Sequence, residues 1–301
     1  MAHRPRKRAK SQNPGVYWQD SAEQRVLGFA GYKVGMTHVA YVDDNESPTK
    51  GQEIVSAATV IEVPPLVVYG MRCYGSKRSL GDIITDDDKI LKLAGFKNKP
   101  VSANLKEEEI EDVRLLAFTM PSKTKIGKKH IEKMEIGCGG KSSKEKFEYS
   151  KTLLGKELRI SDVFKIGEYV DLVSITKGKG WQGAVKRFGV ALQRRKATGK
   201  RRHVGTLGQW HPAYALYTVP QAGQTGYHRR TELNKRILKI SQNPEEINPS
   251  GGFQSYGFVG NDFVLIKGSV AGPTKRLVKF RLASRFSGSH KEPQLTFISN
   301  V

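Results

Sequence analysis

The sequence predicts a mainly β fold with an α/β insertion, a long basic finger loop and a basic N-terminal extension. Three observations support this prediction: short stretches rich in Val, Ile and Tyr between turn signals, sixty consecutive residues without an acidic side chain, and a basic N-terminus. Strands of this length and spacing are typical of a barrel or a sandwich. The 301 residues are 38% hydrophobic, which is ordinary for a folded protein and excludes wholesale disorder.

The formal charge of +22 is concentrated in two segments. Residues 1–10 hold five Lys or Arg and no acid, and Leu172 to Thr231 holds twelve and no acid, so these segments account for 17 of the 22 charges. Concentrated positive charge repels itself, and we therefore expect a polyanion to neutralise it. A short charge run is usually a solvated face, but sixty acid-free residues exceed what solubility requires.

Two groups of predicted strands frame the longer basic segment. The first group is Val26–Lys33, Thr37–Val42, Ala57–Val63 and Leu66–Tyr74, separated by Gly, Asp-Asp-Asn or Pro-Pro turn signals. The second group is Tyr169–Ile175, Gly252–Val259, Phe263–Lys267 and Leu277–Leu282, with Gly-Asn-Asp at 260–262 as a hairpin turn. A barrel would close by pairing of the first group with the last, and the intervening segments would leave it as insertions.

The insertion at residues 78–155 is predicted to be an α/β subdomain that packs on the barrel. Three aspartates at 86–88 would lie in the first turn of a helix, where carboxylates complement the helix dipole, and Gly95 would end that helix. A second helix is predicted at Lys144–Leu154 and a weaker one at Glu157 to Val163.

Residues 194–252 are predicted to form an extended finger. Glycine and proline interrupt every hydrophobic period there, and the apolar residues are too scattered to bury a core. A loop of this length without secondary structure indicates a function. We therefore expect the finger to become fixed on a binding partner.

One motif points to a different class of protein. Gly178, Gly180 and Gly183 follow the predicted strand Tyr169–Ile175 and match the Gly-x-Gly-x-x-Gly pattern of a dinucleotide-binding turn. Such a site needs an acidic residue about twenty positions later, but the next acid is Glu232 and no βαβ alternation surrounds the motif. An RNA-modifying or nucleotide-dependent enzyme using this turn stays open as the alternative function.

The sequence contains no catalytic or metal-binding constellation. His203, His211 and His228 lack metal-ligand spacing, no Ser or Cys stands in a nucleophile elbow, and Cys73 and Cys138 are expected to be reduced thiols. No apolar run approaches the ~18 residues of a membrane span, and no apolar stretch follows the basic N-terminus as in a secretory signal. We therefore expect an intracellular protein that is not an enzyme.

Cations and flat side chains alternate in the basic segments, a composition suited to RNA. Lys and Arg neutralise phosphates, while aromatic rings offer faces on which unpaired bases stack. For Trp210 and Tyr217, burial in a small local core is the alternative. The predicted RNA-binding residues are Arg4, Arg6, Lys7, Arg8, Lys10, Lys177, Lys179, Trp181, Arg194, Arg195, Lys196, Lys200, Arg201, Arg202, His203, Trp210, His211, Tyr217, Gln224, Tyr227, His228, Arg229 and Arg230.

Five segments carry a resemblance to a known family. They are GFAGYKVGMTHV at 28–39, TKGKGWQGAVKRFGV at 176–190, GQWHPA at 208–213, QAGQTGYHRRTELNKRI at 221–237 and NPSGGFQSYGFVGNDFVLIKGSVAGPTKR at 248–276. With them the chain resembles the universal large-subunit ribosomal protein L-three family. The short C-terminus favours the archaeal type of this family.

The resemblance implies a closed six-stranded β-barrel and a structural role in the large ribosomal subunit. It further implies that the protein binds large-subunit rRNA, nucleates early assembly and extends a loop towards the peptidyl transferase centre. The expected partners are large-subunit rRNA and neighbouring large-subunit ribosomal proteins, with one copy per ribosome, no homo-oligomer, no membrane and a cytoplasmic location. No cofactor is expected, and magnesium ions bound with the rRNA are left open.

The loop of the family matches Trp210 to Thr231 in this sequence. Tyr217 stands where many eukaryotic members carry a tryptophan at the loop tip, and His211 matches a histidine that is methylated in some of them. The expected division of the chain is a basic N-terminal extension at 1–25, a barrel from 26–77, 156–193 and 253–301, the acidic α/β insertion at 78–155 and the basic finger loop at 194–252.

Overall fold

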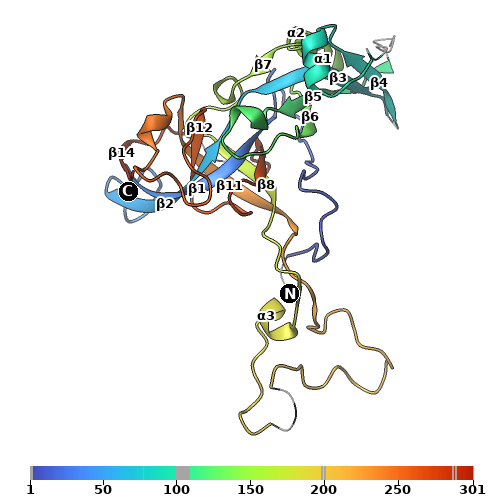
Figure 1. Ribbon diagram of the computed structural model, residues 1–301, viewed down its shortest axis with the longest axis vertical. Helices are drawn as coiled ribbons and strands as arrows, with labels where there is room; N and C mark the ends of the chain where they lie inside the picture. The colour runs from blue at the N-terminus through green and yellow to red at the C-terminus, as the bar shows by residue number, and fades with distance from the viewer. Residues whose placement is uncertain are drawn as a thin grey trace.

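The computed structural model describes residues 3–76, 78–98, 100, 109–197, 199, 201–286, 288 and 290–300. In this part of the chain the protein is mainly β, as predicted (Figure 1). The strands are β1 (Gly28–Val42), β2 (Glu53–Glu62), β3 (Leu66–Tyr74), β4 (Ser79–Ile84), β5 (Asp112–Thr119), β6 (Lys133–Gly137), β7 (Glu157–Leu158), β8 (Tyr169–Ile175), β9 (Trp181–Gln182), β10 (Gly223–Gln224), β11 (Arg229–Ser241), β12 (Phe263–Lys267), β13 (Leu277–Leu282) and β14 (Leu295–Ile298). The helices are α1 (Asp88–Leu93), α2 (Ser143–Thr152) and α3 (Ala184–Phe188), with short 3-10 turns at Pro121–Lys123, Ile160–Asp162 and Pro244–Glu246.

Six antiparallel strands form a closed ring. They follow the order β1, β2, β12, β11, β8 and β13, and β13 pairs with β1 again. The ring strands contribute Leu172, Ile266 and Phe280 to the largest apolar core, where all three are buried. β14 pairs with β1 beyond the ring. Strands from the two ends of the chain therefore meet, as the order of the predicted strands required.

β1 is one strand of fifteen residues where two were expected. The glycine at 35 predicts a break between Val26–Lys33 and Thr37–Val42. In the structure the pairing with β2 shifts register between Lys33 and Gly35, and a bulge of this kind absorbs an extra residue without ending the strand.

A second antiparallel sheet has the order β4, β3, β5 and β6, and β7 pairs with the edge of β3. β3 has the predicted bounds, Leu66–Tyr74, but it pairs in this sheet and is no strand of the ring, contrary to our expectation. An apolar run fits a strand buried in either sheet, so the pattern does not specify the partner. Two prolines at 64 and 65 separate β3 from β2, where the chain leaves the ring.

The helices of the second sheet begin at capping residues visible in the sequence. The Asp87 side chain accepts from the backbone N–H of Lys89 at 2.9 Å at the start of α1, and Ser142 caps α2 through the N–H of Glu145. Both helices lie where they were expected. The helix predicted at Glu157 to Val163 is wrong, because this segment forms β7 and a single 3-10 turn.

The prediction of a finger that reaches residue 252 is wrong on its C-terminal side. β11 is a ring strand between β8 and β12, and six of its thirteen residues are Lys, Arg or Glu, which hides its alternation. Pairing compensates these charges. Arg236 is 3% exposed and its guanidinium binds Asp44 through two bonds of 2.6 and 2.5 Å, while Lys239 pairs with Glu246 at 2.6 Å.

Gly252–Val259 forms turns and an isolated bridge between Phe253 and Gly257, so the strand predicted there is also wrong. The side chain of Asn248 fixes this loop by binding both the N–H and the C=O of Val259. The residues expected as a hairpin turn bind Glu62 instead, because the N–H groups of Gly260 and Asn261 donate to its buried carboxylate at 3.1 and 3.0 Å.

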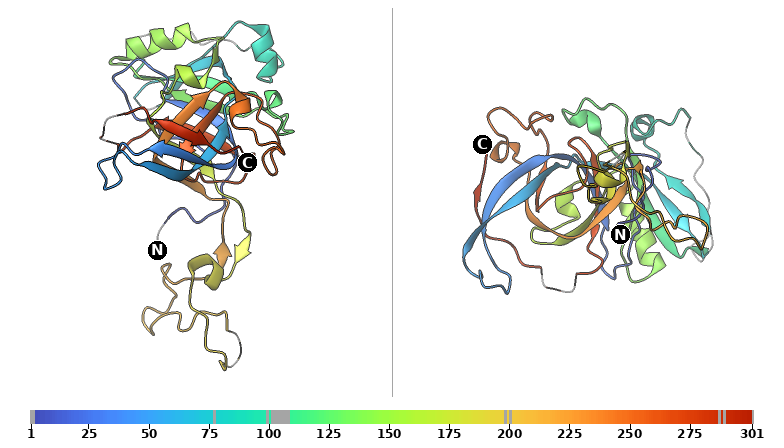
Figure 2. Two further views of the ribbon diagram at one scale, coloured as in Figure 1. Left: turned by 90° about the vertical axis from the view of Figure 1, so that its left-hand side faces the viewer. Right: turned by 90° about the horizontal axis from the view of Figure 1, so that it is seen from below.

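Residues 176–228 project from one end of the ring as an extension, between β8 and β11 (Figure 1). Figure 2 shows the same projection after a quarter turn, with the second sheet at the opposite end of the molecule. Residues 3–18, here called the N-terminal strap, run from the second sheet past the ring to the base of the extension. The two basic segments of the sequence thus lie together.

Candidate nucleic-acid interface

The base of the extension is a two-stranded stem of residues 176–182 and 223–228. It continues the pairing of β8 with β11: the N–H of Lys179 donates to the carbonyl of Thr225, and the N–H of Thr225 to that of Gly180, both at 2.9 Å. Beyond these bonds, β9 pairs with β10. The stem therefore starts as a direct outgrowth of two ring strands, which fixes its direction.

Glycine is required where the two chains of the stem approach most closely. Gly226 has a φ of +71°, and a Cβ atom there would lie 2.1 Å from the carbonyl oxygen of Lys177. Gly178 lies opposite, with the Cβ of Tyr227 3.5 Å from the position its own Cβ would take. The glycine motif at 178–183 therefore serves an antiparallel stem, and the parallel βαβ setting of a dinucleotide site is absent from the described strands.

Arg187 ties the outgoing chain to the returning one. Its Nε donates to the carbonyl of Gln224 at 3.1 Å and its guanidinium to that of Gln221 at 3.0 Å. A side chain at position 223 would collide with this guanidinium, since a Cβ of Gly223 would lie 2.6 Å from Nη1. Sequence reasoning counted Arg187 only as charge; the neighbouring Gly223 was the signal that a large side chain lies against the backbone.

The N-terminal strap docks on the stem through backbone groups. The N–H of Ala9 donates to the carbonyl of Tyr227 at 2.8 Å, and the carbonyl of Lys7 lies 3.0 Å from Nδ1 of His228. Nearer the terminus, the Arg230 guanidinium donates to the carbonyl of Pro5 at 2.8 Å. On the side of the strap these bonds use main-chain groups, so docking does not depend on its cationic side chains.

Three arginines of the strap lie over aromatic rings of the extension. The guanidinium carbons are 4.8 Å from the ring centroid for Arg4 over Tyr217, 4.9 Å for Arg6 over Phe188 and 5.7 Å for Arg8 over Tyr227. Contacts of this kind are attractive, which offsets the repulsion between two positively charged segments.

Aromatic side chains on the extension are open to solvent. Trp210 is 87% exposed, Trp181 76% and Tyr217 74%, so the alternative of a small local core for Trp210 and Tyr217 is wrong. Such rings offer bare faces for stacking. His228 was expected to contact RNA, but its side chain is buried and its Nδ1 faces the carbonyl of Lys7. His228 therefore belongs to the docking site of the strap.

The other predicted residues fall into three places. Lys177 and Lys179 are exposed on the stem, where the amide of Gln224 donates to the carbonyl of Gly226. Between 189 and 222 the described residues contain no helix or strand, and the chain turns back where the N–H of Gln193 donates to the carbonyl of Arg201. Exposed there are Arg194, Arg195, Lys196, Arg201, Arg202, His203 and His211, while Lys200 lies outside the described residues.

Other classes of site find no support in the described residues. No group of three His, Cys, Asp or Glu is placed to hold a metal ion, and no helix has the length and apolar character needed to cross a bilayer. Cys73 and Cys138 are free and buried, and burial raises the pKa of both thiols to about 11. At neutral pH these thiols are protonated and unreactive.

Comparison with known proteins identifies the family. A family model described as Ribosomal protein L3 matches residues 1–88 and 95–300. The chain belongs to the ribosomal protein L3 family. Proteins named large ribosomal subunit protein uL3 are 46% identical in Methanothermobacter thermautotrophicus, over 100% of this chain and 95% of that protein, and 46% identical in Methanococcoides burtonii, over 99% and 95%. The protein of the same name in Methanocaldococcus jannaschii is 42% identical over 100% and 95%.

Family membership confirms the resemblance to the archaeal type and decides between the two function classes. The ribosomal protein L3 family consists of structural proteins, so the chain is not an enzyme and the nucleotide-dependent alternative is wrong. As a ribosomal protein it acts in the ribosome, in the cytoplasm.

Proposed function

We propose that this protein is a structural constituent of the large ribosomal subunit that binds large-subunit rRNA through the N-terminal strap and the extension together. The observation that carries the proposal is the docking of the strap on the stem, with Ala9 bound to Tyr227 and three arginines stacked over rings of the extension. It merges the two basic segments into one cationic surface. Counterion release from rRNA would then drive binding.

In this proposal the residues have different roles. The cations of the strap and of residues 177–202 neutralise phosphates, and Trp181, Trp210 and Tyr217 stack on unpaired bases. The ring of six strands acts as the β-barrel that anchors the protein at the subunit surface, with the acidic second sheet available to neighbouring ribosomal proteins. Magnesium ions would enter only together with the rRNA.

The proposal extends to assembly. A single copy would bind early, near the 3′ end of the rRNA, and the far end of the extension would point towards the peptidyl transferase centre, while Tyr217 lies beside Arg4 of the strap. The length of the projection (Figure 1) and the exposure of its rings support a tip that reaches into folded RNA. The domain division follows: strap, ring, second sheet with its helices, and extension, with β3 in the second sheet and β11 in the ring.

Brief proteolysis of the free protein and of assembled large subunits tests the proposal. We expect rapid cleavage between residues 189 and 222 in the free protein, because the described part of this segment has no secondary structure, and strong protection in the subunit. The ring strands, which resist cleavage in both states, are the internal control. A free extension that resists protease, or one cleaved equally fast in the subunit, would contradict the proposal, as would failure to crosslink to rRNA through residues 176–228.

A further inference from the structure

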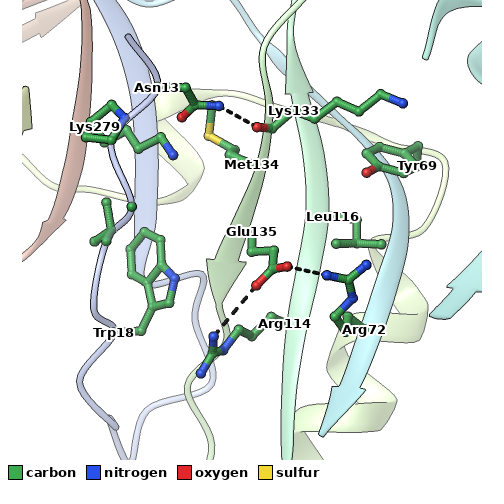
Figure 3. A pocket seen from close by; sticks show the side chains of 13 residues that line it. Asn13, Trp18, Tyr69, Arg72, Arg114, Leu116, Lys133, Met134, Glu135 and Lys279 are labelled. Atoms are coloured by element: carbon green, nitrogen blue, oxygen red, sulfur yellow. Dashed lines mark hydrogen bonds and ion pairs between the residues drawn. The ribbon is translucent and has the colours of Figure 1, made fainter. Parts of the chain in front are cut away.

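A crevice between the two sheets lies outside the surface described above. It has a volume of about 350 Å³ and is bounded by β13 of the ring, the N-terminal strap and the strands of the second sheet (Figure 3). Its walls include the indole of Trp18 and four cationic side chains, against a single carboxylate, that of Glu135. These cations are Arg72, Arg114, Lys133 and Lys279.

Three of the four cations already have partners. Arg72 binds Glu135 at 2.5 Å and Asp82 at 2.7 Å, Arg114 pairs with Glu135 at 3.7 Å, and the ammonium of Lys133 lies 4.4 Å from the centroid of the Phe96 ring. Glu135 is thereby shared between two arginines. Arg114 also pairs with Asp112 at 3.4 Å, so three carboxylates face the four cations, and the net charge of this set is positive by one.

Lys279 is the fourth cation. It is 5% exposed, and within the described part of the chain no hydrogen-bond or ion-pair partner contacts its ammonium. Burial lowers the pKa of Lys279 to about 8, against the weaker opposing effect of Glu132 and Glu135. Its Nζ is not among the fully buried polar atoms that lack a partner, so most of the side chain is buried while the ammonium itself faces the crevice, where an anionic ligand can reach it.

A second polar group in the crevice also lacks a partner. Nδ2 of Asn13 donates to the carbonyl of Lys133 at 2.6 Å, which fixes the orientation of the amide, and Oδ1 is left buried without a donor. Figure 3 shows Asn13 and Lys279 on the same side of the crevice. The site therefore offers one cationic donor and one acceptor, and the two are not bonded to each other.

We propose that this crevice binds one ribonucleotide of an RNA strand, with the phosphate on Lys279 and the 2′-hydroxyl on Asn13. A phosphate only accepts hydrogen bonds, as the ammonium requires, and the 2′-hydroxyl of RNA supplies the donor that Oδ1 requires. The volume is of the size of small-ligand sites. The inference rests on the proposed rRNA binding and adds a second, separate contact.

RNA is favoured over an acidic protein segment because the crevice adjoins the cationic surface. Pro14 and Gly15 line both the crevice and a neighbouring cavity of about 420 Å³ at the base of the extension. That cavity has Lys7, Arg8, Lys10 and Arg229 in its walls. An RNA strand held at the cations of the neighbouring cavity can follow the uncharged residues 11–16 of the strap into the crevice, where it meets the next cations.

The test uses the full-length protein, the large-subunit rRNA of its source organism and the variant Lys279→Met, with the exposed Lys144→Met of α2 as the matched control. For Lys279→Met we expect the slope of log affinity against log salt to become shallower by about 0.7 to 0.9, and for the control no change. The melting temperature of the free protein should not fall in Lys279→Met, since the ammonium has no partner in the described part of the chain that the variant would lose. A merely structural lysine would lower it.

A labelling experiment measures the protonation and the accessibility of the Lys279 ammonium directly. Acetylation of lysines by acetic anhydride, followed by mass spectrometry over a range of pH, should show Lys279 of the free protein titrating near pH 8. Adding rRNA should raise that midpoint and protect the residue, because a phosphate favours the charged form. DNA of the same sequence, which lacks the 2′-hydroxyl, should protect less.

The outcomes distinguish failure of the crevice assignment from failure of the proposed rRNA binding. If rRNA left the labelling of Lys279 unchanged and Lys279→Met behaved like the control, the crevice assignment would be wrong, while steep salt dependence of the wild type would keep the proposed function. Protection of Lys279 only by a neighbouring ribosomal protein would assign the crevice to an acidic segment instead. Failure of the wild-type protein to bind rRNA would overturn the proposed function itself.

Discussion

At the scale of single residues, ionised side chains hold loops to the ring where the sequence shows only scattered charge. Asp44 and Arg236 are far apart in the chain, and their pair joins the turn after β1 to β11. Arg236 also donates to the carbonyl of Lys291 at 2.8 Å, which fastens the C-terminal segment to the same point. One buried guanidinium thus fixes three segments.

The Arg236 guanidinium holds the pKa of the Asp44 carboxyl below its usual value. The carboxylate therefore stabilises the fold at pH values above its unfolded pKa of about 4, and this contribution is lost as the pH falls through the lower pKa of the folded state. We expect Asp44→Asn to reduce the free energy of unfolding at pH 7 by roughly 1 to 3 kcal/mol, because Arg236 keeps its burial but loses a charged partner.

Urea unfolding at pH 7 and at several pH values below 4 measures this effect, with Glu46→Gln on the exposed part of the same turn as the control. The difference between wild type and Asp44→Asn should shrink as the pH falls. A difference that stays constant with pH would mean that the amide change acts through packing and not through charge.

At the scale of elements, the strap is held by planar arginines and by its backbone. Changing Arg4, Arg6 and Arg8 together to Lys keeps every charge but removes the flat guanidinium groups that lie over Tyr217, Phe188 and Tyr227. We expect protease to cleave the strap several-fold faster in the free protein, while the salt dependence of rRNA binding stays the same.

Lys7→Arg combined with Lys10→Arg is the control for this prediction, since in the described structure the strap cations that lie over aromatic rings are Arg4, Arg6 and Arg8 and neither lysine ammonium does so. The rate of cleavage within residues 3–18 is followed by mass spectrometry. Equal rates in the Arg-to-Lys variant and the wild type would show that the backbone bonds of Ala9 and the neighbouring residues hold the strap without the rings.

Local patterns predicted many elements correctly. β3, β8, β12 and β13 have the expected bounds, because each is a short apolar run between turn residues, and α1 begins at its aspartate cap. The errors arise where the structure of a segment depends on a partner that is distant in the sequence. β11 was missed because its charged residues hide the alternation and its partner strands, β8 and β12, are not specified by any local pattern. β3 was assigned to the wrong sheet because an apolar run does not specify its partner strand.

At the scale of the whole molecule, the distribution of positive charge predicts which surface of the protein binds a polyanion. Replacing Lys200, Arg201 and Arg202 by Ala should weaken rRNA binding and reduce its salt slope by about two to three units. Replacing the exposed Lys89 and Lys92 of α1 and Lys97 just after it by Ala is the matched control. Affinity measured over a series of salt concentrations provides both slopes, and equal slopes in the two variants would place residues 200–202 away from the RNA.

The sequence predicts the class of the candidate site, a polyanion-binding surface, but not its geometry. Seventeen charges in two acid-free segments indicate a polyanion partner, whereas contacts such as Ala9 with Tyr227 join residues too far apart in the chain for any local pattern to pair. Lys279 was missed for the same reason. In sequence it is one charge in an apolar strand, and only the strap and the second sheet that cover it make it a buried cation.

Closure of the ring also has a consequence for the order of events during translation. Gly28 pairs with Arg281, so the ribosome must synthesise nearly the whole chain before the last seam of the ring forms. At roughly 5 to 20 residues per second, β1 can pair with β2 early but waits ten seconds or more for β13. The strap waits almost as long for Tyr227, and throughout this time the nascent chain presents an undocked basic tail.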